Sequence, residues 1–264
     1  VVPLHIIVGE NDYIDDDKID LTAMQENLSS YKGKTSTSSP SPHEWENAFG
    51  DADVVFCITI TSSLSGTYNS AVIAKDIYEH NHAGRKVYVL DSLSTGPEIA
   101  LFIEKIAELI KAGFAPDDIY KTLLEYKDKT HLYFSLASLN NFAKNGRISP
   151  VIAAGIGLLG VRVVGKASDE GTLLPLDKCR GEKRALKKLI DHLKECGYTD
   201  GKIIIAHNNN EAGALELKKL IENTFGIFNG TIQKTRALCS YYAEPGSLLI
   251  GFEASLCNHK PYKD

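Results

Sequence analysis

The sequence predicts an α/β protein of two α/β domains, the first with a mostly parallel sheet covered by helices and the second with a mixed sheet and helices. Its 264 residues, 43% hydrophobic and 24% charged, suffice for one large or two modest domains. Strand-like runs alternate with amphipathic helical stretches in the first half, as in parallel βαβ units. The pattern changes near residue 130 without a flexible linker, so we expect packed domains at residues 1–130 and 131–264.

In the first half, three runs rich in β-branched and apolar residues predict strands at residues 1–8, 54–60 and 86–90. Apolar residues at helical spacing predict helices in three segments, which are HEWENAF (43–49), AVIAKDIYEH (71–80) and EIALFIEKIAELIKAG (98–113). Gly113 and Pro116 end the last of these helices.

The second half begins with the strand-like run LYFSLASL (132–139) and the short helical stretch NNFAKN (140–145). Two β-rich runs at 161–168 and 172–179 are joined by Asp-Glu-Gly, which predicts a hairpin. A lysine-rich amphipathic helix (182–196) follows, and the remaining segments read as strand 202–207, helix 211–223 and strands 231–238 and 247–254.

Composition excludes several classes of protein. A net charge of -5 provides no basic surface for nucleic acid. The five cysteines are an odd number with wide spacing, which argues against a disulfide framework. The longest apolar run (151–161) is too short to span a membrane, and no signal peptide opens the chain. We therefore expect a soluble, cytoplasmic protein.

The run TSSLSGTYNSA (61–71) lies between a predicted strand and a predicted helix and carries an unusual number of hydroxyl groups: Thr61, Ser62, Ser63, Ser65 and Thr67. Backbone N–H groups at a helix N-terminus favour an anion, and short hydroxyl side chains add donors. A single N-cap would account for only one of these residues. The run predicts an anion site, while a nucleophilic serine assisted by His131 or His207 and by Asp91 stays open.

The other motifs give weaker evidence for a binding or catalytic site. GIGLLG (155–160) has the glycine spacing of a dinucleotide site, but it precedes a strand instead of following one, so we interpret it as structural. The histidines show no metal-ligand spacing, and we predict no metal. Arg147, in the turn KNGRISP, suits either a carboxylate or phosphate ligand or a surface salt bridge.

Several segments in order along the chain together resemble the DegV family of bacterial fatty-acid-binding proteins. They are KTS (34–36), TSSLSGTYNSA, VLDSLSTG (89–96), SLNNFAKNGRIS (138–149), DEGTLLPLDKCRG (169–181) and EPGSLLIGF (244–252). The resemblance implies that two domains clasp one long-chain fatty acid. It assigns the carboxylate to hydroxyl and backbone groups of Thr35, Ser36, Ser62, Ser63 and Gly66, with Arg147 and Tyr242 near the head group.

The resemblance also places the acyl chain in the second domain, against Phe134, Leu136, Leu139, Ile152, Ile156, Leu158 and Leu159, all of which suit a protein core equally well. It implies a non-catalytic subunit without a cofactor that presents its fatty acid to a separate fatty acid kinase and contacts membranes peripherally for lipid exchange. A serine-dependent acyl hydrolase and a lipid-binding regulator without a kinase partner are the alternatives.

Two departures from the family pattern bear on the head-group site. The family usually opens with a strand and a Thr-Asp-Ser turn, and this chain begins after them, so we expect one strand and one wall of the site to be missing. A later family loop usually reads His-x-Gly-Pro-Gly, where this chain has Tyr242 and Glu244 in place of the His and the first Gly. These two replacements change the charge expected near the carboxylate.

Overall fold

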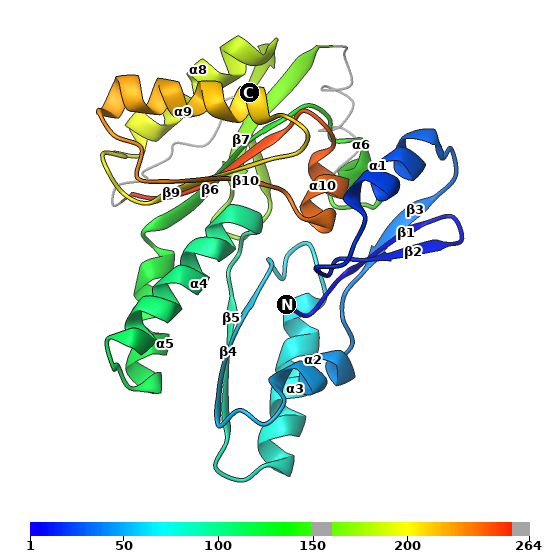
Figure 1. Cartoon of the computed structure of the whole chain (residues 1–264), viewed down its shortest axis with the longest axis vertical. Coiled ribbons are helices and arrows are strands. Elements are labelled where there is room, and N and C mark those ends of the chain that lie inside the picture. The colour runs from blue at the N-terminus through cyan, green and yellow to red at the C-terminus, as the bar shows by residue number, and fades with distance from the viewer. Residues whose placement is uncertain (149–159, 255–264) are drawn as a thin grey trace.

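The computed structural model describes residues 1–148 and 160–254, in which a six-stranded mixed sheet organises the second half of the chain (Figure 1). The strand order is β10-β9-β11-β6-β7-β8. The strands are β6 (Thr130–Leu136), β7 (Val161–Ala167), β8 (Leu173–Arg180), β9 (Ile203–His207), β10 (Gly230–Lys234) and β11 (Leu248–Glu253). Among the strand pairs described in this sheet, β9–β10 is parallel and the others are antiparallel. β7 and β8 form the antiparallel hairpin that Asp-Glu-Gly predicts.

Helices α8 (Glu182–Glu195) and α9 (Glu211–Phe225) lie together over one face of this sheet (Figure 1). Alternate residues of β11 divide between the two faces, as the pleat of a strand requires. Ile250 and Phe252 join the core beneath α8 and α9, whereas Leu249 joins a separate cluster on the opposite face. The sheet is therefore buried on both sides, and its second face is available to other elements.

A parallel pair of strands, β4 (Val54–Thr59) and β5 (Lys86–Asp91), forms the centre of the first half. Helices cover both sides of this pair: α2 (Pro42–Phe49) and α3 (Thr67–Asn81) on one side, α4 (Gly96–Lys111) and α5 (Pro116–Lys127) on the other. Tyr78 of α3 packs with Val87 of β5, and Phe102 of α4 packs with Leu90 of β5. This arrangement, together with the six-stranded mixed sheet, confirms the predicted fold class.

Helix α4 connects the parallel pair to the six-stranded sheet. Leu101 and Phe102 share one core cluster with Ile204 of β9. At Gly251 of β11 the helix approaches so closely that an added Cβ would lie 2.5 Å from the backbone nitrogen of Glu98. Glycine is therefore required at this strand position because the backbone of α4 occupies the space of a side chain.

The N-terminal segment differs from the prediction. We expected residues 1–8 to supply a strand of the parallel sheet, but β1 (His5–Val8) pairs antiparallel with β2 (Asn11–Ile14) and β3 (Thr35–Ser38). Gly9, at φ +64°, reverses the chain directly after β1, so the strand forms a hairpin instead of leading to a crossover helix. Helix α1 (Leu21–Ser30) follows β2.

A second difference concerns residues 231–238, which we predicted as one strand. β10 ends at Lys234, and helix α10 (Ala237–Ala243) begins three residues later. The carboxylate of Asp15 accepts hydrogen bonds from the backbone N–H groups of Ala237 and Leu238, each at 3.1 Å. This long-range cap satisfies the first donors of the helix, which no local pattern in the sequence reveals.

Among the described residues, no helix combines the length and apolar character needed to cross a membrane. Cys57, Cys179 and Cys239 carry free thiols.

Candidate ligand-binding site

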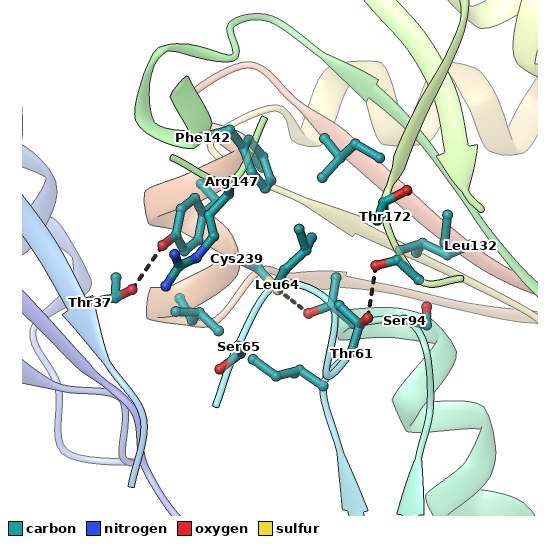
Figure 2. Close-up of a pocket in the computed structure, with 18 of the residues that line it drawn as sticks. Thr37, Thr61, Leu64, Ser65, Ser94, Leu132, Phe142, Arg147, Thr172 and Cys239 are labelled. Atoms are coloured by element: carbon teal, nitrogen blue, oxygen red, sulfur yellow. Dashed lines mark hydrogen bonds between the residues drawn. The ribbon is translucent and has the colours of Figure 1, made fainter. Parts of the chain in front are cut away.

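A cavity of about 280 Å³ lies where the ends of β4 and β5 meet the second face of the six-stranded sheet (Figure 2). Its walls come from segments far apart in the chain. They include Leu4, residues 37–39, the loops after β4 and β5, strands β6 and β11, the β7–β8 hairpin, and helices α6 (Asn140–Lys144) and α10. Such a concave, mostly apolar cavity with a few polar groups is typical of a small-molecule site.

The polar end of the cavity is built from the loops that follow β4 and β5. Ser65 and Gly66 precede α3, and Ser94 and Thr95 precede α4; all four line the cavity. Neither helix has a side-chain hydrogen bond at its N-cap residue. Two helix N-termini therefore bring backbone N–H donors and partial positive charge to the same end of the cavity, at the carboxyl edge of a parallel strand pair.

Thr61 is a buried hydroxyl residue that connects the polar end of the cavity to the β7–β8 hairpin. Its side chain is 6% exposed, and its Oγ1 donates to the carbonyl of Gly171 at 2.8 Å (Figure 2). Its backbone N–H donates to the carbonyl of Ser94 at 2.9 Å. Asp91, at the end of β5, accepts from the backbone of Ser62 and of Leu93 and so holds the two loops together.

Ser94 contributes a buried hydroxyl to the site. Its side chain is 3% exposed, and Oγ has no hydrogen-bond partner of good geometry. It nevertheless lies close enough to Glu98 to lower the pKa of that carboxyl, so we take the contact with Glu98 as weak. A buried hydroxyl without a hydrogen-bond partner destabilises the folded protein, and a ligand that accepts a hydrogen bond from it would remove that penalty.

The rest of the cavity is apolar. Leu132, Phe134 and Leu136 alternate along β6 and point to the same side, where Leu249 of β11 and Leu173 of β8 join them. The walls on this side offer no charge, so the cavity suits an elongated hydrocarbon with one polar end.

Arg147 and Tyr242 line a part of the cavity that faces β3. Tyr242 Oη and Thr37 Oγ1 share a hydrogen bond of 2.8 Å, and the ring of Tyr242 lies 4.8 Å from the ring of Phe142. The Arg147 side chain is exposed and donates to the carbonyl of Asn145 at 3.3 Å. Glu244 does not enter the cavity; its carboxylate accepts from the Ser138 hydroxyl and the Asn141 N–H and so caps α6.

Five of the residues predicted for the site line the cavity: Gly66, Phe134, Leu136, Arg147 and Tyr242. Four predicted ligands do not line it. Thr35 shares a 2.6 Å hydrogen bond with Tyr241, Ser36 and Ser62 have exposed side chains, and the Ser63 hydroxyl donates to the carbonyl of Glu170. Their assignment to the carboxylate stays a prediction.

Leu139 is buried beside the cavity without lining it. The predicted acyl-chain residues Ile152, Ile156, Leu158 and Leu159 lie outside the described residues. Sequence reasoning named Thr61 in the hydroxyl run but did not choose it as a site residue, and it missed Ser94; both line the polar end. Both fall in the runs TSSLSGTYNSA and VLDSLSTG that carried the resemblance, but the spacing gave no means to choose among neighbouring hydroxyls.

The two histidines considered for a serine nucleophile are bonded elsewhere among the described residues. His131 contacts the carbonyl of Ala254, and His207 contacts the N–H of Asn210, so neither of these histidines reaches a serine of the 61–71 run through a hydrogen bond. Burial raises the pKa of the Cys239 thiol, which lines the cavity, to about 11, so this sulfur stays protonated at neutral pH. Within the described part of the chain, no group of three or more His, Cys, Asp or Glu side chains is placed to hold a metal ion.

Comparison with known proteins places these features in a family. A family model described as "Uncharacterised protein, DegV family" matches residues 1–255. A DegV domain-containing protein of Streptococcus pneumoniae is 41% identical over 252 residues, which cover 96% of this chain and 90% of that protein.

Two solved structures agree closely with this fold. A DegV family protein from Eubacterium eligens loaded with heptadecanoic acid has a TM-score of 0.94 and 40% identity, covering 96% of this chain and 92% of that one. The Streptococcus pneumoniae fatty acid kinase (Fak) B3 protein loaded with linoleic acid has a TM-score of 0.94 and 41% identity, covering 96% of this chain and 90% of that one. These matches confirm the resemblance read from the sequence: the chain belongs to the DegV family.

Proposed function

We propose that this protein binds one long-chain fatty acid, with the carboxylate at the polar end of the cavity and the acyl chain along its apolar wall. The observation that carries the proposal is the combination of an apolar cavity with a single polar end, at which the buried Ser94 hydroxyl lacks a full partner. Relatives that are 40% and 41% identical hold heptadecanoic and linoleic acid, respectively, which supports the same class of ligand here.

In this arrangement the Ser94 hydroxyl is the side-chain donor to the carboxylate, and the N-termini of α3 and α4 add their backbone dipoles. Thr61 holds the wall beside it through its hydrogen bond to Gly171. The site would lie between a domain of residues 1–130 and a domain of residues 131–264. Each buried CH₂ group contributes about 0.8 kcal/mol, so a long acyl chain supplies roughly 10 kcal/mol before ordering costs. The hydrocarbon tail therefore supplies most of the affinity, and the hydroxyl groups determine where the head group lies.

We further infer that the protein does no chemistry of its own and presents the bound fatty acid to a separate fatty acid kinase. The support is the 41% identity with the pneumococcal fatty acid kinase (Fak) B3 protein, together with the exposed Arg147 beside the cavity. The fatty-acid-loaded protein, mixed with a fatty acid kinase and ATP, is expected to support formation of an acyl phosphate. Acyl phosphate formation at the rate seen without this protein would contradict the presenting role.

The ligand itself is tested by mass spectrometry of an organic extract of the purified protein. We expect one long-chain fatty acid per protein molecule, because an apolar cavity of this size would otherwise expose its walls to water. An unrelated protein purified from the same host is the control. An extract without fatty acid, both before and after incubation with heptadecanoic acid, would refute the proposal.

A further inference from the structure

Glu98 is a buried carboxyl group that lies directly behind the polar end of the cavity. It follows Ser94 by four residues, in the first turn of α4, and is 4% exposed. Thr130 of β6 donates a hydrogen bond to its Oε1 at 2.8 Å. Glu98 does not line the cavity itself, but its neighbour Ser94 does.

The surroundings of Glu98 provide little compensation for a negative charge. No salt bridge involves Glu98 among the described residues. Lys127 of α5 lowers the pKa of Glu98 by charge attraction, and Thr130 of β6 donates a hydrogen bond to it. The protonated Cys239 thiol of α10 lies next to Gly96, near the start of α4. On β11, Glu253 pairs in register with Thr130, but the Tyr126 hydroxyl and the Lys202 N–H hold its carboxylate.

Burial raises the pKa of Glu98 to about 7, and the nearby Ser94 hydroxyl and the hydrogen bond from Thr130 oppose that rise. The carboxyl group is therefore neutral in mildly acidic solution and ionises near neutrality. A buried carboxyl with a pKa in this range is far from its ordinary value near 4.3 and costs folding free energy that a glutamine or leucine would not. Its presence next to the ligand cavity points to a function in binding.

The Ser94 hydroxyl connects Glu98 to the cavity because it has one proton to donate. When Glu98 is ionised, its carboxylate competes for that proton, and a ligand carboxylate then meets a second buried negative charge. When Glu98 is neutral, the Ser94 hydroxyl is available to donate into the cavity. The two carboxyl groups thus depend on the same donor.

We propose that Glu98 is a proton-linked positioning residue of the head-group site: an anionic ligand binds best when Glu98 is protonated, because the Ser94 hydroxyl then donates to the ligand. The inference rests on the proposed binding of a fatty acid. It predicts that binding of the carboxylate is coupled to the uptake of a proton by Glu98, and that a ligand of the same length with a neutral head group shows no such coupling.

The expected pH dependence follows from this linkage. Below about pH 7, Glu98 is already neutral and affinity does not depend on its state; above that pH, affinity for a carboxylate falls by up to tenfold per pH unit. The experiment measures dissociation constants of heptadecanoic acid and heptadecanol from about pH 5.5 to about pH 8.5 by competition with a fluorescent fatty acid. It compares the native protein with Glu98→Gln and Thr130→Val, and with Glu216→Gln at an exposed site on α9 as the matched control.

Ionisation of the free fatty acid affects every variant equally, so differences between variants are the readout. We expect the loss of affinity at high pH to persist in Glu216→Gln and to disappear in Glu98→Gln. In Thr130→Val we expect it to begin at a higher pH, because losing the hydrogen bond from Thr130 raises the pKa of Glu98 further. If Glu98 and Thr130 had purely structural roles, these substitutions would not change the pH at which affinity begins to fall.

Identical pH profiles in the native protein, Glu98→Gln and Thr130→Val would overturn this inference while leaving fatty-acid binding intact. The same conclusion would follow if heptadecanol showed the same pH dependence as heptadecanoic acid. Failure of the native protein to bind heptadecanoic acid at any pH would instead overturn the proposed function and this inference with it. Near-ultraviolet circular dichroism identifies any variant that fails to fold, and Thr130→Val then decides the question independently of Glu98→Gln.

Discussion

Replacing Gly171 by alanine is expected to weaken fatty-acid binding by roughly tenfold to a hundredfold and to lower the unfolding free energy by about 2 kcal/mol. Gly171 lies in the β7–β8 turn at φ +77°, where an alanine is strained by about 1 kcal/mol. Its added Cβ would also lie 2.2 Å from Thr61 Oγ1 and 3.0 Å from the Leu93 backbone. Because Thr61 donates to the Gly171 carbonyl, the hydroxyl cannot turn away without losing that bond.

The turn must therefore move away from the loop after β4, and the cavity loses one wall. Gly113→Ala is the matched control, since Gly113 has the same φ of +77° and its added Cβ meets nothing within 4 Å. Thermal or denaturant unfolding and ligand competition separate the two effects. Equal losses in both variants, with unchanged affinity in Gly171→Ala, would show that the hairpin turn is not part of the binding site.

The second large effect on fatty-acid affinity is expected from substitutions at Ser94 and Thr61, the two hydroxyl residues at the polar end of the cavity. We expect Ser94→Ala to weaken binding of heptadecanoic acid by about 1.5–3 kcal/mol, the range for a hydrogen bond to a charged group. Thr61→Val acts indirectly, because the single Thr61 proton is already donated to the Gly171 carbonyl and not to the ligand. In this variant the Gly171 carbonyl loses its donor. Competition binding measures both, and heptadecanol should respond less because its head group carries no charge.

Ser62→Ala and Thr35→Ala distinguish this assignment from the one that the family resemblance implies. Ser62 has an exposed side chain, and the Thr35 hydroxyl is bonded to Tyr241, so we expect both variants to bind within about twofold of the native protein. Strong loss of affinity in Ser62→Ala with little change in Ser94→Ala would restore the assignment based on the resemblance and refute the one based on the cavity.

Segments with a strong hydrophobic pattern were predicted well, because the spacing of their apolar residues shows directly which side chains become buried. The strands at 54–59 and 86–91 and the hairpin around Asp-Glu-Gly belong to this group. By contrast, β3 reads Thr-Ser-Thr-Ser and has no apolar signal. It forms a strand because it pairs with the edge of β1. Its two threonine hydroxyls also form hydrogen bonds with Tyr241 and Tyr242, which lie more than 200 residues away in the sequence.

The candidate site was predicted at the level of loops and not of atoms. The hydroxyl run after residue 60 and the run ending at Gly96 both reach the cavity. Which hydroxyl points inward depends on backbone contacts that sequence spacing does not reveal. Asp91 binds the N–H of Ser62, whose side chain is exposed, while Thr61, one residue earlier, lines the cavity.

The position of β11 determines when the cavity can exist during protein synthesis. β11 is the last strand of the described chain in sequence, yet it lies between β9 and β6 in the middle of the sheet. Until residues 248–253 leave the ribosome, β9 and β10 cannot join β6, β7 and β8, and the wall at Leu249 is absent. Contacts between such distant segments form late because closing long loops is entropically unfavourable. The cavity is therefore complete only after the last described strand has been synthesised and has joined the sheet.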